Sequence, residues 1–277
     1  MKTRQVGNTD LHFTVIGLGT WAMGGGGWKW GWGPQDDDAS IAAIHRAVEQ
    51  GINWVDTAPI YGFGRAEEVV GKALRGLTPR PLVATKCSRV WDEQHNVSGN
   101  LEERSLRLEL ERSLRLLQAE VIDLYFMHYP LPEQDMERGW ETLSRFKREG
   151  KVRQIGVSNI GLEHLKRLQA IEPVACIQPP YSLLERGIEK EIIPYCRAQG
   201  IGIVAYSPLQ RGLLTGQFSK ERIESLPEDD HRKRDKHFVE PAGSVNLQLV
   251  EGLRALAARR STRPCREPIG CSRPRTS

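Results

Sequence analysis

Hydrophobic and polar positions along the chain alternate between two periods. Short runs of β-branched and apolar residues are each followed by a longer stretch in which apolar residues recur every three or four positions. Seven runs have the character of strands, namely 13–19, 52–57, 81–86, 121–128, 152–158, 174–178 and 202–207. The helical stretches between them cover 38–50, 66–75, 101–117, 136–149, 161–170 and 188–199. This consistent alternation predicts a parallel sheet built from β-α units.

Glycines and a turn sequence mark the borders of these elements. Four glycines come just after a helical stretch, at the position where the backbone often turns left-handed: Gly51, Gly76, Gly150 and Gly200. The segment Gly-Asn-Thr-Asp at 7–10 has the composition of a tight turn. It predicts a small β-hairpin before the first strand, which would close the bottom of a barrel.

Seven β-α units fit either a closed barrel or an open, doubly wound sheet. An open sheet that binds a dinucleotide carries G-x-G-x-x-G after its first strand. Here the glycine-rich stretch is 17–34, in which Trp21 and Met23 stand where a tight phosphate turn needs small residues. The length of 277 residues also suits a barrel of about 250 residues. We therefore predict an α/β protein, a (β/α)8 TIM barrel with an N-terminal β-hairpin.

The composition is that of a globular protein of the cytoplasm. Charged residues make up 27% of the chain and hydrophobic residues 39%. No apolar run approaches the roughly 20 residues of a membrane span, and no apolar stretch follows the positively charged N-terminus. The five cysteines form no C-x-x-C pair, which indicates free thiols in a reducing compartment. We expect a cytoplasmic protein that binds neither a membrane nor a metal ion.

The net charge of +4 is concentrated near the end of the chain. Six arginines and one acidic residue lie from position 259 onward, so residues 1–258 are close to neutral. Binding to nucleic acid is therefore not expected. The segment STRPCREPIGCSRPRTS, from position 261, lacks apolar periodicity and contains several helix-breaking residues.

This composition predicts that residues 1–258 form the barrel and that 259–277 form an aberrant, disordered tail. A change of reading frame near Arg260 would explain it. The eighth strand would then be missing, which leaves the first and seventh strands with open edges. We expect such a protein to be poorly soluble or weakly active.

Ionisable side chains stand at the ends of successive predicted strands. Asp56 ends the second strand, and Tyr61 lies in the loop that follows. Lys86 ends the third strand and His128 the fourth. In a barrel, these carboxyl ends share one mouth, where catalytic residues lie.

This set has the chemistry needed for carbonyl reduction. Tyr61 would donate a proton to the carbonyl oxygen, and Lys86 would lower the pKa of that phenol. Asp56 would keep Lys86 charged, and His128 would orient the oxygen. A buried Asp–Lys pair is more often structural, so the assignment depends on all four residues occurring in this order.

Around these residues the sequence resembles the aldo-keto reductases. The resemblance is carried by GINWVDTAPIYG (51–62), ATK (84–86) and IDLYFMH (122–128), and continues through 151–159, 178–186 and 202–216. It implies an oxidoreductase that reduces aldehydes or ketones to alcohols by hydride transfer, independently of metal. It also implies a catalytic tetrad, Asp56, Tyr61, Lys86 and His128, with Tyr61 as general acid. The implied cofactor is NADP, with NAD as the alternative.

The resemblance assigns binding residues as well. Ser158, Asn159 and Gln178 would hold the nicotinamide carboxamide, and Tyr206 would stack on its ring. The pyrophosphate would be lined by Ser207, Pro208, Leu209, Gly212 and Leu213. Gly19, Thr20, Trp21 and Asp56 would also approach the cofactor. The carbonyl substrate would contact Trp21, Tyr61, Trp91, His128 and Tyr129.

Several alternatives remain open at this stage. Trp28, Trp30 and Trp32 would either wall an aromatic substrate pocket or stiffen the glycine-rich loop. The protein would otherwise be a catalytically impaired or non-catalytic nicotinamide-binding subunit, or a Schiff-base aldolase that uses Lys86. The sequence predicts a small-molecule substrate but neither its identity nor the oligomeric state.

Overall fold

The computed structural model describes residues 1–261, with side chains up to 259. The chain separates into two compact units. One is formed by residues 1–208 and 227–231, and the other by 209–226 and the described residues from 232 onward. Within the described part, no helix is both long and apolar enough to cross a membrane.

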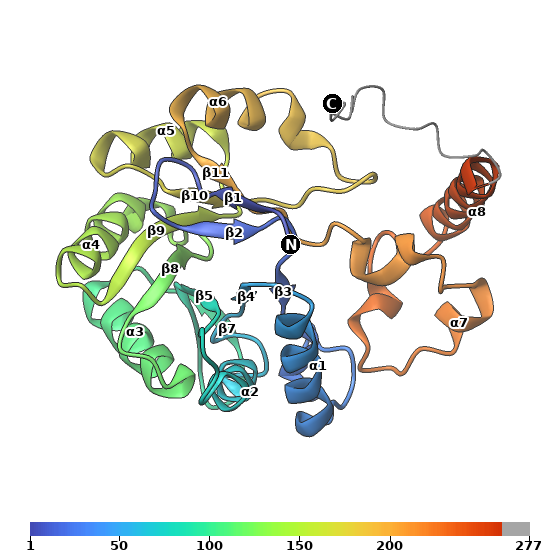
Figure 1. The fold of residues 1–277 in the computed structure, drawn as a ribbon, viewed down its shortest axis with the longest axis horizontal. Coiled ribbons are helices and arrows are strands. Elements are labelled where there is room, and N and C mark those ends of the chain that lie inside the picture. The colour runs from blue at the N-terminus through green and yellow to red at the C-terminus, as the bar shows by residue number, and fades with distance from the viewer. Residues whose placement is uncertain (262–277) are drawn as a thin grey trace, which may run out of the picture. The chain divides into compact units, whose positions relative to one another are not determined.

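A curled parallel sheet of seven strands forms the centre of the first unit (Figure 1). The strands are β3 (Leu18–Gly19), β4 (Trp54–Asp56), β5 (Leu82–Cys87), β8 (Ile122–Met127), β9 (Val152–Ser158), β10 (Cys176–Gln178) and β11 (Gly202–Ile203). They follow one another in the sheet in sequence order, so each β-α unit lies beside the next. All seven predicted strands are present, although β11 covers only the first two residues of the predicted 202–207. β3 and β11 form the two ends of the strand order.

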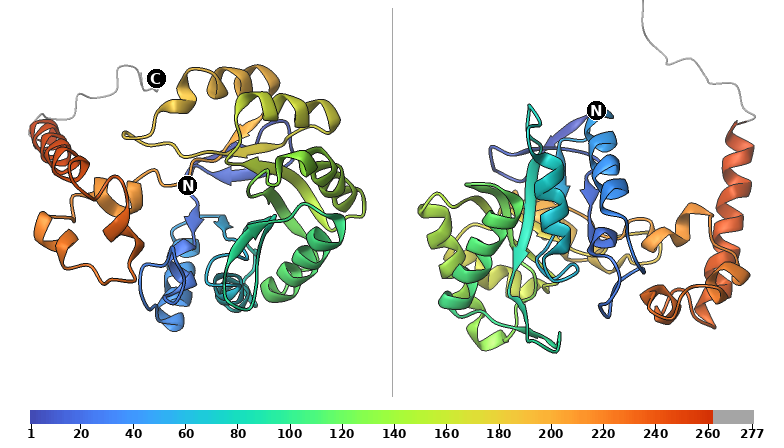
Figure 2. Two further views of the ribbon diagram at one scale, coloured as in Figure 1. Left: turned by 180° about the vertical axis from the view of Figure 1, so that it is seen from behind. Right: turned by 90° about the horizontal axis from the view of Figure 1, so that it is seen from below.

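Six helices cover the outer face of this sheet (Figures 1 and 2). They are α1 (Asp37–Glu49), α2 (Arg65–Leu74), α3 (Glu103–Leu117), α4 (Met136–Arg148), α5 (Leu162–Ile171) and α6 (Ile192–Gln199). The six predicted helices are thus confirmed to within a few residues. Asp36 caps α1 by accepting a hydrogen bond of 2.7 Å from the backbone N–H of Ala39. Gly200 ends α6 in the left-handed conformation that the sequence indicated.

Two hairpins lie outside the seven-stranded sheet. The predicted N-terminal hairpin consists of β1 (Thr3–Gln5) and β2 (His12–Thr14). The prediction of one strand over 13–19 is wrong in its first part, because Phe13 belongs to β2 and β3 begins only at Leu18. Phe13 stacks on Trp54 with ring centroids 4.5 Å apart, which seats the hairpin against the amino-terminal ends of the strands.

The second hairpin, β6 (Arg89–Trp91) and β7 (Val97–Gly99), joins β5 to α3 and was not predicted. Three short 3₁₀ helices are inserted elsewhere in the first unit, namely η1 (Trp21–Gly24), η2 (Glu133–Asp135) and η3 (Gly187–Glu189). The main core lies between the sheet and helices α3 to α5, where Tyr125, Trp140 and Phe146 are fully buried. This core holds the strands rigid, and thereby fixes the positions of the residues at their ends.

The second unit contains η4 (Gln210–Thr215), α7 (Lys220–Glu224) and α8 (Ala242–Ser261), with η5 (His231–Arg234) at its border. Phe218 and Phe238 pack edge to face at 5.1 Å, and Arg211 forms an ion pair of 2.8 Å with Asp235. The last helix continues three residues into the predicted tail. The rest of that tail, 262–277, lies outside the described residues, so the division at 258 and the missing eighth strand stay predictions.

Candidate active site

Four side chains predicted to act together stand at neighbouring strand ends. Asp56 is the last residue of β4, and Lys86 is the last but one of β5. His128 directly follows β8, while Tyr61 lies in the turn between β4 and α2. Because β4, β5 and β8 are adjacent and parallel, these positions open at the same end of the sheet.

The turn that carries Tyr61 is fixed by a close approach of two backbone segments. The backbone N–H of Tyr61 donates to the carbonyl of Ala58 at 3.1 Å, and the backbone carbonyl of Tyr61 accepts from the N–H of Ala66 at 3.2 Å. Gly62, at φ 62°, follows directly, and a side chain there would collide with the carbonyl oxygen of Gly24. Only glycine suits this position, so the turn can pack closely against the loop after β3.

Lys86 and Asp56 form a buried ion pair. The ammonium of Lys86 donates to both carboxylate oxygens of Asp56, at 3.0 and 2.8 Å, and to the carbonyl of Thr57 at 2.7 Å. Gln178 adds a hydrogen bond of 2.7 Å from its amide nitrogen to Asp56. Burial lowers the pKa of Lys86, whereas Asp56 opposes that shift. The charged form of Lys86 therefore depends on Asp56.

Tyr61 and His128 lie beside each other close to this ion pair. The Lys86 ammonium lies 5.1 Å from the centroid of the Tyr61 ring, and the rings of Tyr61 and His128 meet edge to face at 6.1 Å. Trp21 packs against Tyr61 at 5.1 Å. The structure thus brings the four predicted residues into one buried cluster.

The sequence predicted a lowered pKa for Tyr61, but in this structure the overall shift is upward. Burial raises the pKa of Tyr61 well above the ordinary value of a phenol, and the carboxylate of Asp56 adds to the rise. Burial also lowers the pKa of His128 well below its ordinary value, with Lys86 and Arg89 contributing. Near neutral pH, Tyr61 is therefore protonated and His128 uncharged, and both can donate a hydrogen bond.

The predicted carboxamide residues lie together at the ends of β9, β10 and β11. The hydroxyl of Ser158 donates to the carbonyl of Gln178 at 2.8 Å, and the amide nitrogen of Asn159 donates to Ser158 Oγ at 3.0 Å. A second donor bond of Asn159 reaches the carbonyl of His128 at 3.0 Å. Tyr206 donates to Asn159 Oδ1 at 2.9 Å. These bonds connect the polar cluster to the strand end that carries His128.

The other predicted cofactor residues fall in two places. Thr20, at the start of η1, donates through its hydroxyl to the carbonyl of Asp56 at 3.1 Å, so the loop after β3 is anchored at the tetrad. Gly19 and Trp21 flank it on that loop. Ser207 and Pro208 follow Tyr206 in the first unit, whereas three residues belong to the second unit: Leu209, Gly212 and Leu213.

Aromatic side chains gather beside Tyr61. The ring of Trp28 lies 6.2 Å from that of Tyr61, and Phe63 packs against Trp91 at 5.4 Å. A cavity of about 610 Å³ adjoins this group. It is lined by Gly27, Trp28, Lys29, Trp30, Phe63, Arg89, Gln94, His95, Asn96 and Val97.

Two of the three loop tryptophans line this cavity, Trp28 and Trp30, and Trp32 is not among its lining residues. Trp28 also donates from its ring nitrogen to the carbonyl of Gly25 at 2.8 Å, so it stiffens the loop as well. The sequence reasoning missed Phe63 and Arg89. The signal that could have found Arg89 is its position, since it is a charged residue two positions beyond the end of β5.

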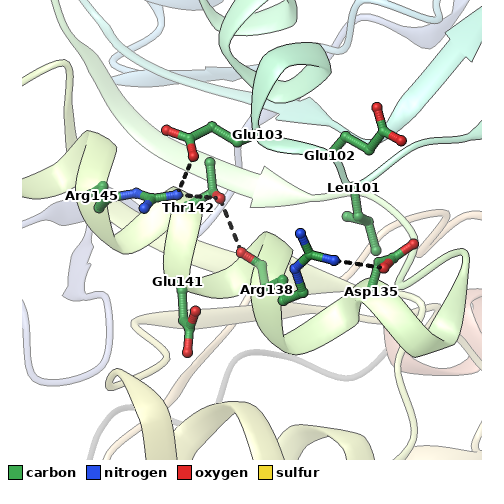
Figure 3. A pocket seen from close by; sticks show the side chains of 8 residues that line it. All are labelled: Leu101, Glu102, Glu103, Asp135, Arg138, Glu141, Thr142 and Arg145. Carbon is green, nitrogen blue, oxygen red and sulfur yellow. Dashed lines mark hydrogen bonds and ion pairs between the residues drawn. The ribbon is translucent and has the colours of Figure 1, made fainter.

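A second surface pocket, between α3 and α4, has a different character (Figure 3). Its charged side chains pair with one another: Arg145 with Glu103 at 2.6 Å, and Arg138 with Asp135 at 3.7 Å. Both arginines of this pocket are thus paired with carboxylates of the protein itself. Elsewhere in the described residues, no three His, Cys, Asp or Glu side chains lie close enough to hold a metal ion.

A buried carboxyl group lies directly behind Lys86. Glu67 of α2 is fully buried and accepts a hydrogen bond of 2.7 Å from the hydroxyl of Thr85. Burial raises its pKa from 4.5 to about 7. Because the folded protein holds this proton more tightly than the unfolded chain, the stabilising contribution is complete below about pH 4.5 and is lost as the pH rises through 7.

Glu67→Gln should remove this pH dependence. The quantity to compare is the difference in unfolding free energy between the wild type and the variant. We expect this difference to decrease by about 3 kcal/mol, to the disadvantage of the wild type, when the pH rises from 5 to 8.5. Urea unfolding at both pH values measures it. Glu68→Gln, on the exposed side of the same helix, is the control and should show no such change. Equal pH dependence in wild type and Glu67→Gln would contradict the expectation.

Comparison with known proteins places the chain in a family. The model of the Aldo/keto reductase family matches residues 15–266. The chain is 38% identical over 262 residues to aldo-keto reductase YhdN of Bacillus subtilis, covering 94% of this chain and 77% of that protein. It is 38% identical over 237 residues to an NADH-specific methylglyoxal reductase of Escherichia coli, covering 80% and 72% respectively.

Among solved structures, the fold is similar to that of a glycerol dehydrogenase from Gluconobacter oxydans. The TM-score is 0.82 at 38% sequence identity, over 93% of this chain and 78% of the other. The resemblance that the sequence motifs indicated is thereby confirmed. With its curled parallel sheet and its matches to the family over most of its length, this chain belongs to the aldo/keto reductase family.

Proposed function

We propose that the protein reduces aldehyde or ketone groups of small molecules to alcohols, with Tyr61 as the general acid. The observation that carries this proposal is the buried cluster in which Lys86, paired with Asp56, lies beneath the Tyr61 ring. Its relatives are named for related chemistry, one as a methylglyoxal reductase and one as a glycerol dehydrogenase. In the same proposal, the seven strands are the greater part of a (β/α)8 barrel.

The cofactor of this proposal is NADPH, with NADH as the alternative. The residues fit a carboxamide, which presents one acceptor and two donor hydrogens, because Ser158, Asn159 and Gln178 bring both donors and acceptors to one spot. Tyr206 lies beside them, tied to Asn159. When bound, a reduced nicotinamide supplies the hydride for the carbonyl carbon. The name of the methylglyoxal reductase supports NADH as an alternative.

The protein's own residues would then protonate and orient the carbonyl oxygen of the substrate. As the carbonyl π bond breaks, its electron pair moves to the oxygen, which takes the phenolic proton of Tyr61. The uncharged His128 donates a hydrogen bond that orients this oxygen. Tyr61 is left as a phenolate, which the ammonium of Lys86 stabilises before the proton is restored from solvent. Asp56 holds that ammonium in place.

Turnover by the purified protein tests the proposal. We expect loss of reduced-nicotinamide absorbance, with NADPH or NADH, in the presence of short aldehydes, and formation of the matching alcohol in equal amount. Cofactor binding, followed by nicotinamide fluorescence, without turnover across the aldehyde panel would instead identify a non-catalytic binding subunit. Covalent trapping of a carbonyl substrate on Lys86 by borohydride would identify an aldolase.

A further inference from the structure

The turn that follows β5 is strained at one buried residue. Ser88 has a φ of 73°, which lies in the left-handed region that residues with a side chain seldom adopt. The residue has no exposed surface. A buried residue keeps such a conformation only where neighbouring groups hold it, because the conformation costs free energy. The contacts that hold Ser88 are therefore worth tracing.

Ser88 holds the backbone next to His128. Its hydroxyl donates to the carbonyl of Tyr129 at 2.8 Å and accepts from the N–H of Tyr129 at 3.2 Å. The N–H of His128 itself donates to the carbonyl of Cys87 at 3.1 Å. The turn after β5 therefore sets the position of the backbone that carries the imidazole of His128.

A buried carboxyl group of α3 lies against this turn. Glu109 is 9% exposed, and its Oε1 accepts a hydrogen bond from the hydroxyl of Ser105 at 3.4 Å. The backbone N–H groups of Ser88 and Arg89 act on the same carboxyl as hydrogen-bond donors. Two successive N–H groups at a turn form a small concavity that suits an anion. The side chain of Glu109 thus stands where an anion fits the strained turn.

The contact between Glu109 and the turn can tighten. Burial raises the pKa of Glu109 from 4.5 to about 8, whereas the N–H groups of Ser88 and Arg89 oppose this rise. The second carboxyl oxygen, Oε2, is buried and has no hydrogen-bond partner of normal geometry among the described residues. A carboxylate accepts hydrogen bonds more strongly than a neutral carboxyl group. Ionisation of Glu109 therefore strengthens its contact with the turn.

The titratable groups that face Glu109 come from α2, from β5, from β8 and from α3 itself. Glu67 of α2 adds to the rise in pKa that burial causes. The guanidinium of Arg112, one turn further along α3, is attracted to Glu109. Cys87 of β5 and Tyr125 of β8 also face it, and burial raises the pKa of both well above the ordinary value. These two groups stay neutral near pH 8, so they add no charge.

We propose that Glu109 is a positioning residue for the reaction, because its carboxyl group holds the strained turn at Ser88 and this turn holds His128 at the mouth of the sheet. The inference rests on the proposed function, since its main effect is read through the reduction of an aldehyde. Glu109 acts through Ser88 and Tyr129 on the backbone of His128, whose imidazole orients the carbonyl oxygen in the proposed reaction.

The variant Glu109→Gln tests this inference, because its amide resembles the protonated carboxyl group at every pH. At pH 6.5 the wild type is itself protonated at this position, so the variant should fold and its kcat should agree within about twofold. At pH 9 the kcat of the wild type should exceed that of the variant roughly tenfold, since a misplacement of about 1 Å can cost about 100-fold. Ionisations of the tetrad and of the cofactor occur in both proteins and cancel in this ratio. A merely structural role would leave the ratio independent of pH.

Amide hydrogen exchange reports on the turn without turnover. At pH 9, the peptide that contains Ser88 and Arg89 should exchange at least roughly tenfold faster in Glu109→Gln than in the wild type, with the other strands equally protected. Glu111→Gln makes the same change on the exposed side of α3 and should alter neither kcat nor exchange. The double variant Ser88→Ala/Glu109→Gln should have the same kcat as Ser88→Ala alone, because Glu109 acts through Ser88.

The outcomes for the two proposals differ. A kcat ratio that stays constant between pH 6.5 and 9 overturns the inference, and so does equal exchange of the turn in both proteins, while the enzyme assignment stands. If the wild type reduces no aldehyde, the proposed function fails and exchange alone decides. Faster exchange in Glu109→Gln then supports the contact between Glu109 and the turn, and equal exchange overturns it.

Discussion

Replacing Tyr61 by phenylalanine should lower kcat for aldehyde reduction by roughly 10²- to 10⁴-fold, the range that a positioned proton donor contributes. The substitution removes one oxygen from a buried ring and leaves its contacts with Trp21 and His128 in place. Affinity for the nicotinamide cofactor should stay within about threefold, because the proposed carboxamide residues lie on other strands. Steady-state kinetics and a fluorescence titration measure the two effects.

Tyr125 provides a matched control for this substitution. It is a fully buried tyrosine of β8, and in the described residues its hydroxyl makes no hydrogen bond of normal geometry. Tyr125→Phe makes the same chemical change away from the cluster, so kcat should be unaffected. A Tyr61→Phe enzyme that keeps more than about a tenth of the wild-type kcat would remove Tyr61 from the role of general acid.

Asp56→Asn should lower the unfolding free energy by about 3–5 kcal/mol, because it leaves the ammonium of Lys86 buried without its counter-charge. Lys86 has no exposed surface, and among the described residues no carboxylate other than that of Asp56 lies within bonding distance, so the loss cannot be repaired locally. Turnover should fall together with stability. Urea unfolding and steady-state kinetics on the same samples measure both quantities.

The double variant Asp56→Asn/Lys86→Met separates stability from chemistry. Removing both charges restores most of the lost unfolding free energy, since no uncompensated charge remains. Activity should not return, because no ammonium is left beside Tyr61. The exposed pair Arg46–Glu49 serves as control, and the equivalent changes there should have a much smaller effect. An Asp56→Asn protein as stable as the wild type would contradict this account.

Two carboxyl groups near Lys86, those of Asp56 and Glu67, both favour its charged form. Asp56 neutralises its charge from the mouth of the sheet, whereas Glu67 lies behind the strand and holds its own proton up to a pKa of about 7. At higher pH, the ionised carboxylate of Glu67 attracts the ammonium of Lys86 and raises its pKa. The same ionisation lowers the free energy of unfolding, because a buried carboxylate is desolvated. Ionisation of Glu67 therefore favours the charged form of Lys86 and at the same time lowers the stability of the folded protein.

Local patterns in the sequence predicted most of the first unit. Strand β5 was expected at 81–86 and lies at Leu82–Cys87, because a strand buried on both faces reads as a continuous apolar run. The β6–β7 hairpin was missed, since its strands of three residues pair only with each other and are too short to form such a run. The strand expected at 13–19 combined two elements, because apolar residues continue across the junction between β2 and β3.

The sequence by itself determined the order of strands and helices and the strand ends at which Asp56, Tyr61, Lys86 and His128 stand, because periodicity and strand position are local properties. The tertiary structure alone decided how these groups behave. It buried Tyr61 and so raised its pKa, against expectation. It also placed Arg89 at an aromatic cavity where, in the described part of the chain, no carboxylate pairs with it. Both outcomes depend on burial and on neighbours that are distant in the chain, and neither quantity can be read from a local pattern.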